Sequence, residues 1–212
     1  MKINKPKIRI IEDKDILEAY NEQEFENYKF SENILENITL KDLTFDSCIF
    51  DKIDFNNIKL DNINFIDVEF NNCDLSNQHF NDRMLSRVVF KNCKIIGISF
   101  IECSLKDIVF ENCVLDYSNF AGSRINNIYF KDCTLKSSSF IETIVKNMYF
   151  EKINFENTEF IKTNLENIDF TTSNISKTRF DFYSIKGIII DMFQCQDIVN
   201  LLGVKIKNDN IE

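Results

Sequence analysis

Apolar residues recur at every fifth position along most of the chain. Every residue whose number is a multiple of five, from Phe25 to Ile190, is Phe, Leu, Ile or Val, thirty-four in succession. The residue two positions earlier is small or apolar in most repeats, and the other three positions carry nearly all of the charge and most of the Asn. A period of five fits neither an amphipathic helix nor an alternating strand. We therefore predict a chain that turns a corner every five residues and coils around its own core.

A second period of twenty residues predicts the number of sides of this coil. The phrases FNNCDL, FKNCKI, FENCVL and FKDCTL begin at residues 70, 90, 110 and 130. Four pentads per turn place residues twenty apart above one another, at the spacing of about 4.8 Å between paired strands. Nineteen of the twenty-one phenylalanines lie at the five-residue positions, so stacked rings are expected to hold the core together. About eight such coils predict a rod of roughly 40 Å.

The five-residue pattern resembles that of the pentapeptide-repeat family, which has a small residue, Asn or Asp, Leu or Phe, and then two variable residues. The segments CDLSN at 73–77, SNFAG at 118–122 and TNLEN at 163–167 follow this pattern closely. The resemblance implies an all-β fold, a right-handed quadrilateral parallel β-helix of about eight coils over residues 23–190. Ile and Cys often stand where the family most often has Ala, so the coil is expected to be slightly swollen on those sides.

The segments outside the repeat are expected to close the two ends. Residues 1–22 are interpreted as an N-terminal cap rather than a disordered tail, with a short strand at 7–11 and a short helix at 13–20 begun by Asp13. Residues 191–212 are interpreted as a C-terminal helix and tail, with Asp191 as the N-cap and Gly203 as the stop. This helix either plugs the last coil or forms a dimer, since an open solenoid end exposes strand edges and apolar surface.

The C-terminal sequence GIIIDMFQ…LLGVKI, at 187–206, resembles the corresponding end of the Qnr-like members of the family. Those members form tail-to-tail dimers through this end, so the resemblance implies a homodimer through the C-terminal helix. The candidate interface residues are Met192, Phe193, Ile198, Val199, Leu201 and Leu202.

Charge and cysteine content narrow the function. The net charge of −9 argues against direct binding of nucleic acid, which needs Lys and Arg clustered on one face. No apolar run approaches the roughly 20 residues that span a membrane, and the start has no signal-peptide pattern, so a cytoplasmic protein is expected. Six of the seven cysteines share one repeat position, which indicates free thiols packed in a reducing compartment. Zinc is not expected, because a column separates the sulfurs by about 4.8 Å instead of converging them on one ion.

One coil departs from the inward pattern. Gln78 and Arg83 occupy the small-residue position, and His79, beside Gln78, is the only histidine. A guanidinium cannot remain unpaired in an apolar interior, so Arg83 must reach solvent or find carboxylate or carbonyl partners. We expect a local bulge here. It is either a packing irregularity or a partner surface that includes Gln78, His79, Arg83 and Arg87.

Two outward columns are unexpectedly apolar. They either mark a partner site or simply reflect the preference of strands for β-branched and aromatic residues. One consists of Ile49, Val89, Val109, Tyr129 and Tyr149, and the other of Ile101, Ala121, Ile141 and Ile161. From the second column, Ile101, Ile141 and Ile161 are candidate residues of a partner surface.

The sequence offers no sign of an enzyme or of a cofactor site. No nucleophile motif, Gly-rich phosphate loop or paired-carboxylate signature stands out among its residues. The resemblance to Qnr-like members implies instead a DNA mimic that binds DNA gyrase or topoisomerase IV and modulates the quinolone sensitivity of bacteria. Outward charges sum to about −1, −3, −2 and −3 on the four sides, and the unbroken register leaves no projecting loops. The alternative is an interaction scaffold with an unknown target.

Overall fold

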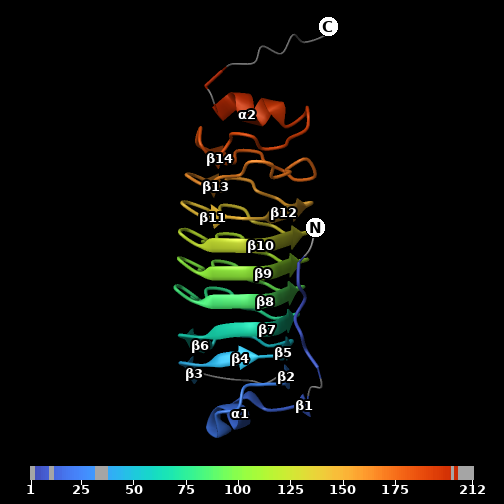
Figure 1. Cartoon of the computed structure of the whole chain (residues 1–212), viewed down its shortest axis with the longest axis vertical. Helices are drawn as coiled ribbons and strands as arrows, with labels where there is room; N and C mark the ends of the chain where they lie inside the picture. Colours follow the sequence, from blue (N-terminus) through green and yellow to red (C-terminus); the bar gives the residue numbers. More distant parts are fainter. Residues whose placement is uncertain (1–2, 10–11, 32–37, 202, 205–212) are drawn as a thin grey trace.

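Strands of successive coils pair in parallel, and each residue lies beside the residue twenty positions further along the chain. Phe50 pairs with Phe70, Phe70 with Phe90, and Phe90 with Phe110. The computed structural model describes residues 3–9, 12–31, 38–201 and 203–204. Within these ranges the chain forms a parallel β-solenoid of about eight coils, drawn as a rod in Figure 1. This is the four-sided coil that the periods of five and twenty predict.

The strands are short, and most of them belong to one sheet. Its ten members are β1 (Glu12–Asp13), β2 (Tyr28–Ser31), β4 (Thr44–Asp46), β5 (Ile49–Asp51), β7 (Asn64–Asn71), β8 (Met84–Lys91), β9 (Ser104–Glu111), β10 (Arg124–Lys131), β11 (Ile144–Val145) and β12 (Met148–Glu151). Two further pairs are β3 (Ile38–Lys41) with β6 (Ile58–Asp61), and β13 (Glu159–Phe160) with β14 (Arg179–Phe180). Single bridged residues, such as Lys94 with Val114, continue the ladders on the other sides.

The backbone turns most corners by adopting a left-handed conformation two residues after the five-residue position. Asp67, Arg87 and Asp107, for example, have φ angles of 54°, 55° and 55°. Asn and Asp tolerate this conformation better than most other residues with a side chain, because their short polar groups bond locally to the backbone. The need for this conformation at most corners explains why Asn and Asp recur there.

Stacked phenylalanine rings form the centre of the core. The ring centroids of Phe70, Phe90, Phe110 and Phe130 follow one another at 4.8, 4.8 and 5.0 Å, with interplanar angles of 4°, 9° and 8°. All four side chains are fully buried. Edge-to-face contacts join this ladder to a second one, as between Phe130 and Phe140. Such offset and perpendicular arrangements are the favourable ones for aromatic pairs.

The small-residue position carries hydrogen-bond donors as well as filling space. The side chains of Cys73, Ser138 and Thr178 donate to main-chain carbonyl oxygens 23 residues earlier, at 3.5, 3.0 and 2.9 Å. The same contact is made by Cys48, Cys93, Cys103, Cys113, Cys133, Ser123, Thr143, Thr158 and Thr163. These thiols and hydroxyls provide a second donor for carbonyl groups inside the coil, which accept two bonds each.

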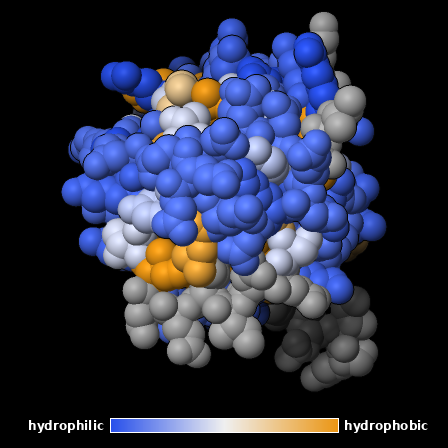
Figure 2. Space-filling model, turned by 90° about the horizontal axis from the view of Figure 1, so that it is seen from below, coloured by the Kyte–Doolittle hydropathy of each residue, from blue (hydrophilic) through white to orange (hydrophobic). Residues whose placement is uncertain are grey.

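Helix α1 (Ile16–Glu22) lies at the N-terminal end of the rod, where its residues Ile16 and Ala19 belong to the core (Figure 1). Its N-cap is Asp15, whose carboxylate accepts from the N–H of Leu17 at 2.7 Å. The expected N-cap, Asp13, lies in β1 instead. Seen from this end, the molecule is mainly hydrophilic, with small apolar patches between the polar side chains (Figure 2).

The segment before α1 differs from the expected cap. The short strand expected at 7–11 is not formed by its described residues 7–9. Residues 3–9, here called the N-terminal segment, run instead along the side of the rod and reach the level of β9 (Figure 1). The chain therefore doubles back along coils that form much later in the sequence.

Helix α2 (Cys195–Leu201) lies at the opposite end and begins four residues later than expected. Asp191 and Gln194 form a reciprocal capping box before it, with N–H donors to the side-chain oxygens at 2.9 and 3.0 Å. None of the helix's residues is buried. The last coil is closed by the side chain of Gln194, which donates to the carbonyls of Phe170 and Ser173 at 2.8 and 2.7 Å. Neither helix of the described ranges is long and apolar enough to cross a membrane.

Candidate partner-binding surfaces

Gln78 points into the coil, which corrects the expectation that it belongs to a partner surface. Its residue is 8% exposed, and its Nε2 donates to the carbonyl oxygens of Phe55 and Ile58, both at 2.8 Å. Its Oε1 accepts from the N–H of Leu60 at 3.4 Å. In the next coil, the backbone of Ser99 makes the equivalent hydrogen bonds: its N–H donates to the carbonyl oxygen of Gln78, and its carbonyl oxygen accepts from the N–H of Phe80. The side-chain amide of Gln78 therefore replaces a backbone peptide group in the ladder.

The expected bulge at this coil is absent, and the ladder opens instead. Backbone pairing follows the twenty-residue register on both sides of this coil, where Phe65 pairs with Leu85 and His79 pairs with Ser99. Strand β6, however, pairs only with β3 among the described residues and makes no backbone pairing with residues 77–79. A groove of about 510 Å³ lies at this opening, with the exposed side chain of His79 in its lining. His79 therefore lines the groove with an exposed side chain, and the buried Gln78 lines it as well.

Arg83 reaches the surface and finds oxygen partners there. Its Nε donates to the carbonyl oxygen of Asn81 at 2.9 Å, and its Nη1 donates to the side-chain oxygen of Asn62. Both outcomes that the sequence allowed for this guanidinium, escape from the core and pairing with oxygen atoms, occur together. The side chain of Arg83 therefore does not fill the interior of the coil, as the small residue does in other repeats.

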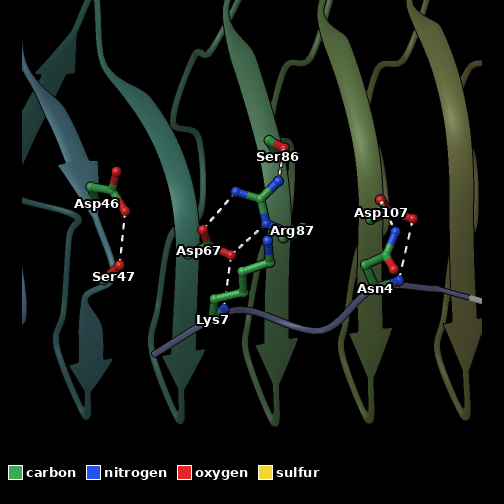
Figure 3. A network of polar contacts seen from close by, with 8 residues as sticks. All are labelled: Asn4, Lys7, Asp46, Ser47, Asp67, Ser86, Arg87 and Asp107. Atoms are coloured by element: carbon green, nitrogen blue, oxygen red, sulfur yellow. Dashed lines mark hydrogen bonds and ion pairs between the residues drawn. The ribbon is translucent and has the colours of Figure 1, made fainter. Parts of the chain in front are cut away.

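Arg87 is engaged within the protein, at a corner of the coil (Figure 3). Its Nε and Nη2 donate to the two carboxylate oxygens of Asp67 at 2.5 and 2.6 Å. The same carboxylate accepts from the backbone N–H of Lys7 in the N-terminal segment at 2.8 Å. Two coils further along, Asp107 accepts from the backbone N–H and the side-chain amide of Asn4, at 3.3 and 2.9 Å. The structure therefore places Arg87 in a network that anchors the start of the chain.

Both carboxylates of this network are ionised at neutral pH. Burial raises the pKa of Asp67, but hydrogen bonds from Arg87 and from the Lys7 N–H outweigh it and hold the pKa below its usual value. Burial likewise raises the pKa of Asp107, and the amide donors of Asn4 and Asn127 lower it by more. Asp67 and Asp107 are 5% and 1% exposed, so these donors replace most of the water that each would otherwise bind.

The remaining candidates of the expected surface lie on the same side of the coil as His79, as Ile101 does between the corners at Gly97 and Glu102. Ile101, Ile141 and Ile161 are half-buried and follow one another in the twenty-residue register, with Ala121 between the first two. In the other apolar column, Val89 is buried and Tyr129 half-buried between neighbouring strands. The surface expected from the sequence is therefore divided among the core, a groove, a corner and a half-buried column.

The C-terminal end exposes large apolar side chains. Met192 and Phe193 are 85% and 89% exposed, and Phe182, in the last coil, is 82% exposed. Of the other residues assigned to a dimer interface, Ile198 and Val199 are half-buried and Leu201 is exposed. Leu202 lies outside the described residues. Such a concentration of exposed apolar groups near one end of a rod is typical of a contact surface.

The cysteine column, formed by Cys73, Cys93, Cys113 and Cys133, is internal, and so are Cys48 and Cys103 on other sides of the coil. Six of the cysteines are buried free thiols, and Cys195, in α2, is exposed. Burial raises the pKa of Cys48 to about 11 and that of Cys103 to about 12, because a thiolate would lose its hydration there. Each buried thiol donates to a carbonyl of the preceding coil, as described above, so the column acts as part of the core.

We predict that a single thiol of the native protein reacts rapidly with Ellman's reagent at neutral pH. The reactive species is the thiolate, and the six buried thiols are not accessible to the reagent. The remaining six should react only as fast as the protein unfolds, or at once in guanidinium. Cys195→Ser should abolish the rapid phase. A native protein in which two or more thiols react at the rate of Cys195 would contradict the internal column.

The register, the left-handed corners and the phenylalanine ladders define a class of protein, a solenoid built from five-residue units. A family model described as "Pentapeptide repeat region" matches residues 63–140, and another described as "Pentapeptide repeats (8 copies)" matches residues 145–176. Together the two matches cover more than half of the chain. The protein belongs to the pentapeptide-repeat family, which confirms the resemblance seen in the sequence.

Solved structures with a similar fold include other pentapeptide-repeat proteins. A trypsin-treated form of QnrB1, described as a plasmid-mediated fluoroquinolone resistance protein, is 21% identical, with a TM-score of 0.48 over 86% of this chain and 89% of that one. HetL from the cyanobacterium Nostoc sp. strain PCC 7120 is 12% identical, with a TM-score of 0.35 over 82% of this chain and 90% of that one. No curated protein sequence matches the chain. These likenesses concern the fold alone.

Proposed function

We propose that the chain is a non-enzymatic protein of the bacterial cytoplasm that binds DNA gyrase or topoisomerase IV in place of DNA and modulates quinolone sensitivity. The observation that carries this proposal is a long, regular rod with a net charge of −9. The DNA-binding groove of such an enzyme is basic, so an acidic rod is attracted to it as DNA is. Because the proposed activity is binding, it requires no catalytic group.

The charge density sets the strength expected of this mimicry. A net charge of −9 over a rod of roughly 40 Å is one negative charge per about 4 Å, compared with one per about 1.7 Å of duplex DNA. The protein therefore carries less than half the charge density of its competitor. Binding is expected at micromolar concentrations and should weaken as salt is added.

We further propose that two copies associate tail to tail through their C-terminal ends. The exposed side chains of Met192 and Phe193 support this, since α2 leaves them uncovered in one copy. A two-fold interface would place each patch against its counterpart. The resulting rod of about 80 Å would match about 24 base pairs of duplex.

A supercoiling assay tests the proposed target. Purified gyrase, with and without a quinolone, is titrated with the protein up to tens of micromolar. We expect inhibition of supercoiling, protection from quinolone-stabilised cleavage, or both, each diminished as salt is raised. Glu102→Gln with Glu142→Gln, which neutralises two exposed carboxylates of one column, should weaken the effect. Absence of inhibition and of protection over the whole range would remove the topoisomerase proposal.

The second candidate function is a scaffold for another protein. It is favoured by the groove beside His79 and by the half-buried column of Ile101, Ile141 and Ile161, neither of which a DNA mimic needs. The same supercoiling assay separates the two functions, because a scaffold with a different target leaves gyrase unaffected.

A further inference from the structure

One corner of the rod carries a line of polar side chains. This corner column consists of Asp67, Arg87, Asp107, Asn127 and Asn147, each twenty residues from the next. Side-chain hydrogen bonds join three of its neighbouring pairs, from Arg87 to Asp67, from Asn127 to Asp107 at 2.8 Å, and from Asn147 to Asn127 at 2.7 Å. The charges of Arg87 and Asp107 attract each other. The N-terminal segment lies along the first three members of this column, Asp67, Arg87 and Asp107 (Figure 3).

The segment and the column match in spacing. Asn4 and Lys7 are three residues apart, and the carboxylates that they contact, on Asp107 and Asp67, are two coils apart. Three residues of extended chain span about 10 Å, and two coils rise by about 9.6 Å. An extended chain therefore meets every second member of the column with every third residue. This match needs no property of the segment other than extension and a donor at each third position.

The column is organised without the segment. Two bonds from Arg87 fix the carboxylate of Asp67, and one of the oxygens so held also faces the Lys7 N–H. Asn127 fixes Asp107 in the same way, and both oxygens of that carboxylate accept donors from Asn4. A site whose acceptors are already held in place loses little freedom when a ligand binds.

The segment also complements the protein in charge. Residues 3–9 contain three basic residues and no acidic one, so the segment has a charge of +3. Since the net charge of the whole chain is −9, the rest of the chain has a net charge of −12. Ile3, Pro6 and Ile8 of the segment are half-buried, whereas Asn4 and Lys7 are exposed apart from the groups that bond to the column. The segment therefore rests on the rod through a few apolar contacts and two polar anchors.

We propose that the corner column is a binding site for an extended basic peptide, and that the N-terminal segment is the ligand that fills it within the chain. The partner is a segment of another protein that presents amide donors three residues apart. The tethered segment has an effective concentration of about millimolar, so a second copy of this chain, whose segment binds no more tightly, is a poor competitor, and a partner must bind the column more tightly than the segment does. A longer partner segment that also reaches Asn147 gains a contact that Asn4 and Lys7 do not make. The proposal is independent of binding to a topoisomerase.

The test uses a fluorescein-labelled peptide of residues 3–9 and full-length protein, with binding followed by fluorescence anisotropy. In the variant Asn4→Ala with Lys7→Pro, the chain's own segment loses the Asn4 side-chain amide and the Lys7 N–H, two of its three hydrogen bonds to the column, and should therefore release it. The peptide should bind this variant at least tenfold more tightly than it binds the wild type. Equal binding to the two proteins would overturn the proposal.

Two further comparisons locate the site. In the released variant, Asp67→Asn with Asp107→Asn should weaken peptide binding at least tenfold, whereas Glu102→Gln, at another corner of the rod, should leave it unchanged. The same Asn4→Ala and Lys7→Pro changes made in the peptide should weaken binding equally, and this needs no change to the column. Equal binding of a scrambled peptide of the same composition would show attraction by net charge alone and would overturn the proposed site.

Discussion

Replacing Phe110 by alanine is expected to lower the free energy of unfolding by about 3–5 kcal/mol. The ring is fully buried between Phe90 and Phe130, at centroid distances of 4.8 and 5.0 Å. In a solenoid each coil contacts only its neighbours, so removing one ring weakens two coil interfaces at once. Neighbouring coils cannot close the gap, because the backbone ladder holds them at a set spacing.

Urea denaturation followed by far-ultraviolet circular dichroism measures this loss. The matched control is Tyr117→Ala, which removes an aromatic ring from the surface seven residues further along the chain, where the residue is 66% exposed. That change should alter the free energy of unfolding by less than about 0.5 kcal/mol. If the two variants were equally stable, the phenylalanine ladder would not be the main source of cohesion.

The second large effect concerns the C-terminal end. We expect the wild type to sediment as a species of twice 25.0 kDa at micromolar concentration, and Met192→Glu with Phe193→Glu to sediment at 25.0 kDa. Burying each such side chain contributes about 1.5–3 kcal/mol, and a two-fold interface contains each residue twice. The two charges should therefore raise the dissociation constant by several orders of magnitude.

Met84→Glu is the control for this measurement. Met84 is also an exposed large apolar residue, at 44%, but it lies in β8 near the middle of the rod. The control variant should still sediment as a dimer. A wild-type protein that sediments at 25.0 kDa at micromolar concentration would contradict association through this end.

Most of the fold could be predicted from the sequence because the repeat leaves few solutions. A period of five with two inward residues specifies a corner in each pentad, and a period of twenty specifies four sides. The order of the phenylalanines then predicts which rings stack, and Phe70, Phe90, Phe110 and Phe130 do so. Each of these inferences depends on residues at constant spacing, where one register satisfies every coil.

The features that the sequence did not predict are those outside the period. Gln78 was singled out correctly as an irregular residue, but nothing in its position indicates that its amide replaces a peptide group and opens the ladder. The contacts of Asn4 and Lys7 join residues 103 and 60 positions apart, and no repeat relates them. One signal was present, since Asp67, Arg87 and Asp107 place alternating charges at successive levels of one corner.

The left-handed corners place side chains at a constant spacing along the rod. Side chains of one corner column lie about 4.8 Å apart, whereas successive residues of an extended peptide lie about 3.3 Å apart. The two spacings therefore coincide at every third residue of the peptide and every second coil of the rod. In the proposed binding mode, such a surface contacts only one peptide residue in three and does not select the two residues between successive contacts. The side chains at the corners can therefore change which peptides are recognised without any change to the phenylalanine core beneath.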